Sequence, residues 1–319
     1  MTQTPLRIVV LGGGVIGSVY AAWLRQAGHQ VSMLARGQRL AEVREHGLVV
    51  EDASTGRRTT ASVATIDHLA PEDTIDLAIV AVQLEQVGEL LPIIAANRRI
   101  PTVLFLVNDA FGAEQFARAL GPGRAVLGFP GIGGTRDGPA IKYYVLPQQP
   151  TTLGETSGAI TPRLQMLAGL IAATGHRVAT TEHMDAWLKT HAIFVACLSA
   201  ALDRNGGDSV RLAHDRRQVA LMVQAIREGF RALRALGIPV TPTNLAVLFG
   251  WMPGWFATWY WQRALRGPVG TLAIAPHARR ARAEMVALAR QVLLLLQSSP
   301  RPVPVLHRLL DGFVESLHG

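Results

Sequence analysis

The residues near the N-terminus whose types and spacing could do chemistry form a glycine-rich turn, GGGVIG at 12–17. The turn follows a strand-like run at 6–11 and precedes a helical pattern at 15–26. In a GxGxxG turn, the first glycine permits the tight turn, the second lets the backbone approach a diphosphate, and the third allows helix and strand to pack closely. The amides that open the following helix attract phosphates. We therefore predict a dinucleotide site at Gly12, Gly14, Val15, Ile16 and Gly17.

The segment after the second strand-like run, 30–35, determines which nicotinamide cofactor we expect. NAD sites usually place an Asp or Glu there for the ribose hydroxyls, but residues 34–39 read LARGQR and contain no acid. Arg36, and with it Arg39, could pair with a 2′-phosphate. The sequence therefore predicts NADP(H) as the cofactor, with NADPH bound more tightly than NADH. The alternative is that Arg36 is an ordinary solvated side chain.

The lysine Lys189 is a second candidate for chemistry. It is one of only two lysines in the chain, the other being Lys142, and it lies within an apolar helical pattern. A lysine in that setting suggests a chemical role, because lysines otherwise lie mostly on the solvated surface. The alternative is that its long side chain reaches back to water from the helix.

The elements that must position these residues predict an α/β protein with an N-terminal Rossmann-type domain and a C-terminal all-helical domain. Strand-like and helical patterns alternate over the first part of the chain, which is typical of parallel βαβ units. The runs 75–82 and 103–107 are almost entirely apolar, as expected of strands covered on both faces. Between 121 and 158, glycines and β-formers predict antiparallel strands that close the edge of the sheet, followed by a helix at 162–174.

We place the boundary between the two domains near Thr181, a good N-cap with Glu182 and Asp185 behind it. The predicted domains are 1–180, which binds the dinucleotide, and 181–319, which binds the substrate and forms any dimer. Beyond the boundary the patterns are helical, and one helix around 219–233 is ended by Gly237 and Pro239. A homodimer through the helical domain is left open.

Composition excludes several classes of protein. The single cysteine, Cys197, allows neither a disulfide framework nor a cysteine-rich metal site, and no spacing of His, Asp and Glu predicts metal. The net charge of +8 comes from dispersed arginines, so we expect no nucleic-acid partner. We find neither a signal peptide nor an apolar run long enough for a membrane span, and expect a cytoplasmic protein without a membrane partner.

Several segments in order resemble the ketopantoate reductase family (2-dehydropantoate 2-reductase), over nearly the whole chain. They are the glycine turn, Leu34-Ala35-Arg36, Glu45-His46-Gly47-Leu48, residues 76–82, Val107-Asn108 with Gly112, Trp187-Leu188-Lys189, and Glu228 through Gly237-Ile238. The resemblance implies a Rossmann domain joined to a helical domain and an NADPH-dependent reduction of a ketone. It also implies that Lys189 is the acid near the ketone and that Asn108 contacts cofactor or substrate near the nicotinamide. The alternative for Asn108 is an ordinary helix cap.

The chain departs from the family pattern at its substrate positions and at Gln83, which we expect to contact the cofactor. Gln83 stands where the family has a second lysine, and Ile193 and Cys197 stand where it has asparagines, four and eight residues beyond Lys189. The family's serine and glutamate fall, in a loose alignment, on Thr258 and Thr271. Sites built to hydrogen-bond a substrate discriminate strongly against changes of this kind. We therefore expect a carbonyl substrate bulkier and more apolar than ketopantoate.

A few further residues lie near the expected substrate. His277 could replace the missing acid or pair with a carboxylate, although a lone histidine is more often a surface or core residue. The tryptophans at 251, 255, 259 and 261 either contact a ligand or, as we favour for each, pack in a core or a dimer surface.

Two functions remain open from the sequence. The first is an NADP-dependent reductase, acting on the ketone of a 2-keto acid or a related carbonyl compound, with Lys189 as its acid. The second is a family relative that binds the nucleotide but has lost turnover and serves a regulatory or binding role. The retained Lys189 and glycine turn favour the first, and the missing glutamate, second lysine and asparagines favour the second.

Overall fold

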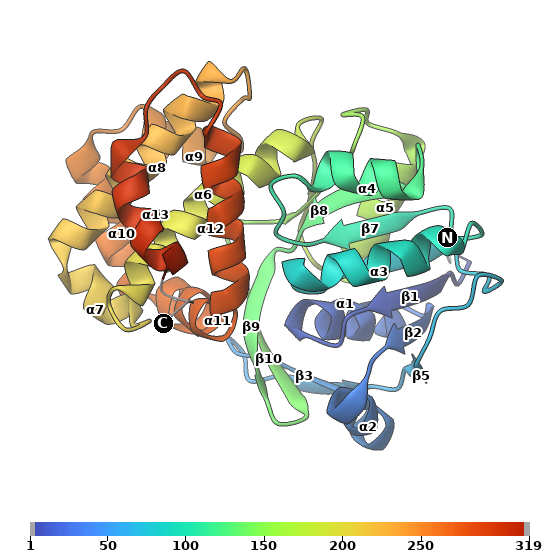
Figure 1. The fold of residues 1–319 in the computed structure, drawn as a ribbon. Helices are drawn as coiled ribbons and strands as arrows, with labels where there is room; N and C mark the ends of the chain where they lie inside the picture. Colours follow the sequence, from blue (N-terminus) through green and yellow to red (C-terminus); the bar gives the residue numbers. More distant parts are fainter. Residues whose placement is uncertain (1–3, 316–319) are drawn as a thin grey trace. The chain divides into compact units, whose positions relative to one another are not determined.

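The computed structural model describes residues 4–315, without the side chains of residues 273, 276 and 277. Within the described residues the chain divides into two compact units. Unit 1 holds the chain up to Val107 together with Gly112–Met184, and unit 2 holds Asn108–Phe111 and the chain from Asp185 onward. The predicted fold class, α/β with a parallel sheet followed by a helical region, is confirmed (Figure 1).

Unit 1 is built on an eight-stranded main sheet with the order β12-β11-β8-β7-β6-β1-β2-β5. The central strands are short and, apart from the exposed Arg7 that begins β1, buried and apolar, with sequences such as RIVVL and LAIV that suit a sheet covered on both faces. The strands are β1 (Arg7–Leu11), β2 (Gln30–Leu34), β5 (Ala64–Ile66), β6 (Leu77–Val80), β7 (Val103–Leu106), β8 (Ala125–Phe129), β11 (Thr151–Glu155) and β12 (Val178–Thr180).

The strand register brings the glycine turn and the end of β2 to one edge of the main sheet. β1 lies between β2 and β6 and is parallel to both, with Leu11 paired to Leu34 on one side and Val80 on the other. The chain therefore leaves the sheet at the same level after β1, β2 and β6. The chain adds β2 and β5 on one side of β1 and then β6 and the later strands on the other side. Ligands of open α/β sheets bind at the carboxyl ends of the strands beside such a reversal of strand order.

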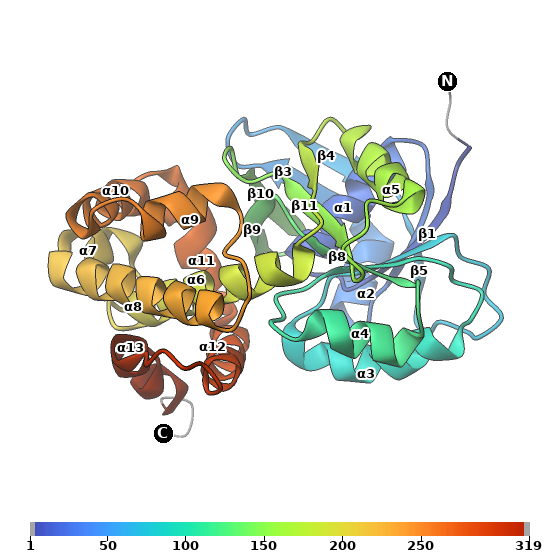
Figure 2. The same ribbon diagram turned by 90° about the horizontal axis from the view of Figure 1, so that it is seen from above.

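Helices cover both faces of the main sheet. Figure 2 shows α3 (Leu84–Ala96) and α4 (Gly112–Leu120) on one face and α1 (Val15–Gln26) and α5 (Pro162–Ala172) on the other. α2 (Gly37–His46) follows β2 directly. The core of unit 1 collects apolar side chains of α1, α5 and the central strands, including Tyr20, whose hydroxyl lies 2.5 Å from Thr151 Oγ1.

A second sheet in unit 1 was not predicted. β8 and β11 are antiparallel neighbours in the main sheet, as expected. The prediction that the β-formers at 142–146 also close the edge of that sheet was wrong. They lie instead in a four-stranded sheet of the order β4-β3-β10-β9, formed by β3 (Leu48–Asp52), β4 (Arg58–Ala61), β9 (Ile132–Asp137) and β10 (Ala140–Val145).

The second sheet covers the outer side of α1. This helix contacts β1 and β2 of the main sheet and all four strands of the second sheet. Residues 17–24 of α1 are consequently buried on every side, including the large ring of Trp23, which is edge-on to Tyr143 of β10. A helix that is buried all round needs cover on two sides, and the strands at 132–145 supply the second cover.

The regular elements that the described residues of unit 2 form are all helices. Its core is formed by apolar faces of α6, α8, α10, α12 and α13, and Figure 2 shows α8, α12 and α13 side by side. None of the helices formed by the described residues combines the length and apolar character needed to cross a bilayer. The elements are α6 (Met184–Asp203), α7 (Ser209–His214), α8 (Arg216–Ala235), α9 (Thr243–Gly250), α10 (Gly254–Arg266), the π-helix η1 (Val269–Ile274), α11 (Ala275–Arg280), α12 (Arg282–Leu296) and α13 (Pro304–Glu315).

Candidate functional site

Two of the glycines in the turn after β1 are required by the fold itself. Gly12 has a φ of +122°, which favours glycine, and a side chain there would collide with the carbonyl of Ala81. A side chain on Gly17 would collide with the carbonyl of Gly12, because α1 starts so close to the end of β1. These two positions fulfil the structural part of the predicted GxGxxG turn.

Gly14 differs, because nothing in the fold requires a glycine there. A Cβ on Gly14 meets no atom within 4 Å, and the residue is exposed at the N-cap of α1. Its φ of −73° is open to any residue. The open space lies at the helix N-terminus, beside the first-turn residues Val15 and Ile16, where unpaired amides and the positive dipole end favour an anion.

Arg36 and Arg39 occupy very different surroundings, although both follow β2. Arg36 is exposed and is the N-cap residue of α2. Arg39 is only 8% exposed and its guanidinium turns back to the glycine turn. Arg36 is thus positioned to meet a ligand at the edge of the sheet, whereas Arg39 is engaged within the protein.

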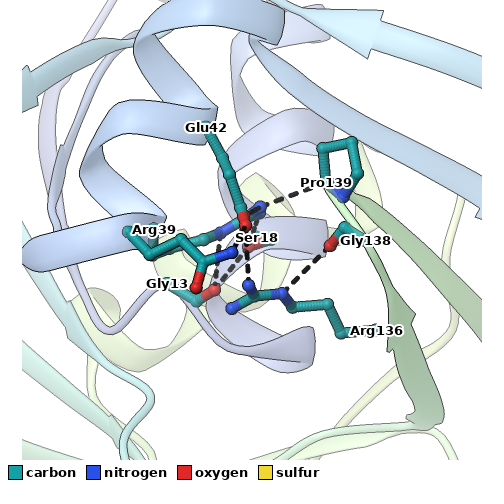
Figure 3. Close-up of polar contacts among 8 residues, drawn as sticks. Gly13, Ser18, Arg39, Glu42, Arg136, Gly138 and Pro139 are labelled. Atoms are coloured by element: carbon teal, nitrogen blue, oxygen red, sulfur yellow. Dashed lines mark hydrogen bonds and ion pairs between the residues drawn. The ribbon is translucent and has the colours of Figure 1, made fainter.

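The contacts of Arg39 form a closed network of hydrogen bonds (Figure 3). Its Nε donates to the carbonyl of Gly13 at 3.0 Å, and its Nη2 donates to Ser18 Oγ, also at 3.0 Å. Its Nη1 donates to the carbonyl of Pro139 at 3.1 Å and to Glu42 Oε2 at 3.2 Å. Burial lowers the pKa of Arg39, and the bond to Glu42 acts in the opposite direction.

Glu42 is an acid close to the turn that was not predicted from the sequence, because it lies eight residues beyond the end of β2. Its side chain is mostly buried and is shared between two arginines, with Oε1 accepting from Arg136 Nη2 at 2.8 Å. The carboxylate is thereby paired on both oxygens. One signal was present in the sequence, since Arg39 and Glu42 are three residues apart and such pairs meet on a helix.

Gln83 and Asn108 follow β6 and β7, the strands next to β1. Gln83 is exposed and is the N-cap residue of α3, and its backbone amide donates to Gln86 Oε1 at 3.3 Å. Asn108 is half-buried directly after Val107, where the chain leaves unit 1. Asn108 caps none of the helices for which a cap residue is described, and its contact with cofactor or substrate stays a prediction.

Lys189 lies on α6 in unit 2, and its ammonium group is paired rather than free. The Nζ donates to Asp185 Oδ1, four residues earlier on the same helix. The side chain of Lys189 is 13% exposed and that of Asp185 is 43% exposed. This ion pair holds the ammonium group in place and leaves it near the surface of the unit. From the sequence, Asp185 is recognisable only as a first-turn acid.

Asp109 is a second group near Lys189 that the sequence analysis did not single out. It is 2% exposed, and its Oδ1 accepts from the amide of Phe111 at 2.8 Å and from Gln291 Nε2 at 3.0 Å. Its Oδ2 is buried without a hydrogen-bond partner among the described residues. Burial raises the pKa of this carboxyl group, while the hydrogen bonds and the charge of Lys189 lower it.

Ile193 and Cys197, predicted to lie near the substrate, are completely buried in the core of unit 2. Ile193 packs so closely on Gly229 of α8 that a side chain at that glycine would collide with it. Burial raises the pKa of the Cys197 thiol far above its usual range. Both residues therefore contribute to the helical core, and a role in binding substrate stays a prediction.

The remaining predicted substrate residues are spread from the first half of α10 to α11. Thr258 is buried and its hydroxyl donates to the carbonyl of Gly254, whereas Thr271 is exposed and donates to the carbonyl of Gly267. The side chain of His277 lies outside the described residues. For Thr258 and Thr271 the hydroxyl is satisfied within its own helical segment, so neither position indicates a ligand.

The tryptophans of α9 and α10 separate into two groups. Trp261 is buried in the core of unit 2, as the packing interpretation expected. Trp251, Trp255 and Trp259 are 82%, 65% and 53% exposed, so core packing was the wrong interpretation for these three. Trp255 and Trp259 are four residues apart on α10 and thus share a face, whereas Trp251 is the C-cap residue of α9.

The site residues fit a nicotinamide dinucleotide better than a metal. Among the described residues, no group of three or more His, Cys, Asp and Glu is arranged to hold a metal ion. The open Gly14 at a helix N-terminus offers room and donors for a diphosphate, and the exposed Arg36 lies after the neighbouring strand. The donor set thus suits a dinucleotide.

Comparison with known proteins agrees with this geometry. Residues 8–158 match the family model of ketopantoate reductase PanE/ApbA. A 2-dehydropantoate 2-reductase from Geobacter metallireducens GS-15 has a similar structure, with 17% identity, a TM-score of 0.76, and coverage of 98% of this chain and 100% of the other. The corresponding enzyme from Methylococcus capsulatus gives 20% identity, a TM-score of 0.69, and coverage of 98% and 97%.

A further solved structure with the same fold is D-mandelate dehydrogenase, described in a ternary complex with NADH and anilino(oxo)acetate. It shares 14% identity and a TM-score of 0.73, over 98% of this chain and 99% of the other. At these identities the solved structures establish the fold alone. Together with the match of the family model, they confirm the resemblance found in the sequence: residues 8–158 form a domain of the ketopantoate reductase PanE/ApbA family.

Proposed function

We propose that the protein is an NADPH-dependent oxidoreductase that reduces the ketone of a 2-keto acid or a related carbonyl compound. The observation that carries the proposal is the glycine turn. Gly12 and Gly17 are needed for the fold, whereas the open space at Gly14 has no structural purpose and suits a diphosphate. In this proposal residues 1–180 bind the nucleotide and residues 181–319 bind the substrate.

The cofactor would be held by the glycine turn and by Arg36. The amides of Gly14, Val15 and Ile16 would donate to the diphosphate, and the exposed guanidinium of Arg36 would pair with the 2′-phosphate of NADPH. When bound, the nicotinamide supplies a hydride to the carbonyl carbon of the substrate. Gln83 and Asn108 follow the two strands beyond β1, and we assign them to the nicotinamide half of the cofactor.

Lys189 would provide the proton that the reduction requires. Reduction of a ketone places negative charge on its oxygen, and an ammonium group beside that oxygen stabilises the charge and donates the proton. One N–H of the ammonium group donates to Asp185, and an ammonium group has three donors. Lys189 can therefore keep its position through Asp185 while another N–H faces the substrate. Asn108 would orient the same oxygen.

The substrate would be less polar than ketopantoate. The positions four and eight residues beyond Lys189 are the apolar residues Ile193 and Cys197, and Thr258 already donates within its own helix. We propose these residues, with Thr271 and His277, as the surroundings of the substrate. A bulkier carbonyl compound would lose less from the missing hydrogen-bond partners.

Two further parts of the proposal concern assembly and location. The exposed side chains of Trp251, Trp255 and Trp259 are of the kind enriched in protein interfaces, which supports a homodimer through unit 2. We also propose a cytoplasmic location. Sedimentation velocity at micromolar concentration should show a dimer in the wild type and a monomer when the three tryptophans are replaced by serine.

The test of the proposed activity is NADPH oxidation by a panel of 2-keto acids and bulkier ketones. With Lys189→Ala, we expect kcat for the best compound to fall by about 10²- to 10⁴-fold, as for the loss of a general acid. The matched control is Lys142→Ala, which removes the chain's only other lysine and should leave the rate unchanged. If the wild type binds NADPH but no compound is reduced, the catalytically impaired relative is the correct interpretation.

A further inference from the structure

We propose that Arg39 is a positioning residue of the nucleotide site, which holds the peptide between Gly13 and Gly14 so that the Gly14 amide faces the diphosphate. This inference rests on the proposed function, because it assumes that a dinucleotide binds at the turn. It assigns to Arg39 a role different from pairing with the 2′-phosphate, which the sequence allowed.

The carbonyl of Gly13 is fixed by two donors. Arg39 Nε donates to it at 3.0 Å and Ser18 Oγ at 3.2 Å, and the same serine oxygen accepts from Arg39 Nη2. In Figure 3 the guanidinium, Ser18 and the Gly13 carbonyl lie together on one side of the turn. The direction of this carbonyl is therefore determined by side chains of α1 and α2.

The direction of the carbonyl determines the direction of the next amide. A trans peptide is planar, and its C=O and N–H bonds point to opposite sides. Since the Gly13 carbonyl points to Arg39, the Gly14 N–H points away from Arg39. Gly14 is exposed and has open space around it, so its N–H is available to a ligand on the opposite side.

The peptide needs this support because it lies between two glycines. Glycine has the widest choice of φ and ψ, so a Gly-Gly peptide can rotate at little steric cost. Binding would then have to supply the free energy that orders the peptide, and a protein contact made beforehand removes that cost. Gly13 itself is required by the contact, since a Cβ on it would lie 2.7 Å from Arg39 Cγ.

Arg39 is in turn fixed by two further acceptors, one on its own helix and one from another segment. Glu42 lies on the same helix and also pairs with Arg136 of β9, and the Pro139 carbonyl belongs to the loop between β9 and β10. A guanidinium has five N–H donors, and the contacts of Arg39 require at least four of them. A buried guanidinium committed in this way is poorly placed to bind a phosphate, whereas the exposed Arg36 is well placed.

The experiment compares NADPH and NADH binding to Arg39→Met, followed by nucleotide fluorescence. Both nucleotides contain the diphosphate, so we expect both affinities to fall by the same factor, about tenfold. Arg36→Ala should lower the affinity for NADPH alone. The matched control is Arg44→Met, which removes an arginine of the same helix that contacts Thr65 and not the turn. It should bind both nucleotides as the wild type does.

Two results would overturn the inference while leaving the proposed function intact. One is a loss in Arg39→Met that is confined to NADPH, which would make Arg39 a ligand of the 2′-phosphate. The other is unchanged affinity for both nucleotides. If Arg39→Met does not fold, Ser18→Ala provides the test. It removes the second donor to the Gly13 carbonyl and should lower the affinity for both nucleotides equally. A wild type that binds neither nucleotide would remove the proposed function as well.

Discussion

Replacing Gly14 with alanine should separate the nucleotide role of the turn from its role in folding. A Cβ at this position meets no atom within 4 Å, and the backbone conformation, φ −73° and ψ −168°, suits alanine. Alanine is a clearly poorer N-cap than glycine, but it also reduces the conformational entropy of the unfolded chain, which stabilises the fold by about 0.4–1 kcal/mol, so the two effects largely cancel and the free energy of unfolding should change by no more than about 0.5 kcal/mol. The expected change in Tm is at most about 2 °C.

The same substitution should weaken nucleotide binding strongly. The methyl group would occupy the space through which a diphosphate oxygen reaches the amides at the start of α1. Loss of one hydrogen bond to a charged group costs about 1.5–3 kcal/mol. That free energy corresponds to a roughly 10- to 150-fold lower affinity for NADPH.

Gly17→Ala is the matched control for this prediction. Its methyl group would collide with the carbonyl of Gly12, and overpacking of this kind costs about 1–3 kcal/mol. The better helix propensity of alanine offsets only about 1 kcal/mol of this destabilisation. Urea unfolding followed by circular dichroism, together with NADPH titration, measures both variants. Normal NADPH binding by Gly14→Ala, or destabilisation as large as in Gly17→Ala, would refute the reasoning.

Three further predictions concern single side chains. Arg36→Ala should lower NADPH affinity about tenfold or more, the loss of a charge-assisted contact, with little change for NADH by calorimetry; equal losses would contradict the 2′-phosphate assignment. Tyr20→Phe should cost about 1 kcal/mol in urea unfolding, since it removes the buried bond to Thr151; an unchanged midpoint would argue against that bond. Burial raises the pKa of Asp109, so the folded protein favours the neutral carboxyl group. The stability that this contributes is fully present below about pH 4, the pKa of the group in the unfolded chain. It is lost as the pH rises through the higher pKa of the folded protein. Asp109→Asn should therefore gain stability relative to wild type between pH 4 and pH 7, and a difference independent of pH would contradict this.

The main sheet could be predicted from sequence because its strands carry their own signal. β1, β6 and β7 are buried on both faces and read as short apolar runs, and the glycine turn marks the connection after β1. The second sheet could not be predicted, because β4 reads RTTA with only its last residue buried. The pairing of β10 with β3 also joins residues that are distant in the sequence, and periodicity does not report pairing of that kind.

The site was predicted best where a residue's role depends on its own segment. Gly12, Gly14 and Gly17 follow from spacing after a strand, and the fold gives each a physical reason or an open space. The burial of Arg39 could not be predicted, because it depends on the loop at Pro139, far along the chain. Asp109 gave no signal, since its surroundings are set by Gln291 of α12.

The most direct test of the account is a crystal structure of the protein with NADPH. We predict that the diphosphate lies within hydrogen-bond distance of the amides of Gly14 to Ile16, with the 2′-phosphate against Arg36. A diphosphate bound elsewhere, or a turn that stays empty at saturating NADPH, would contradict the account.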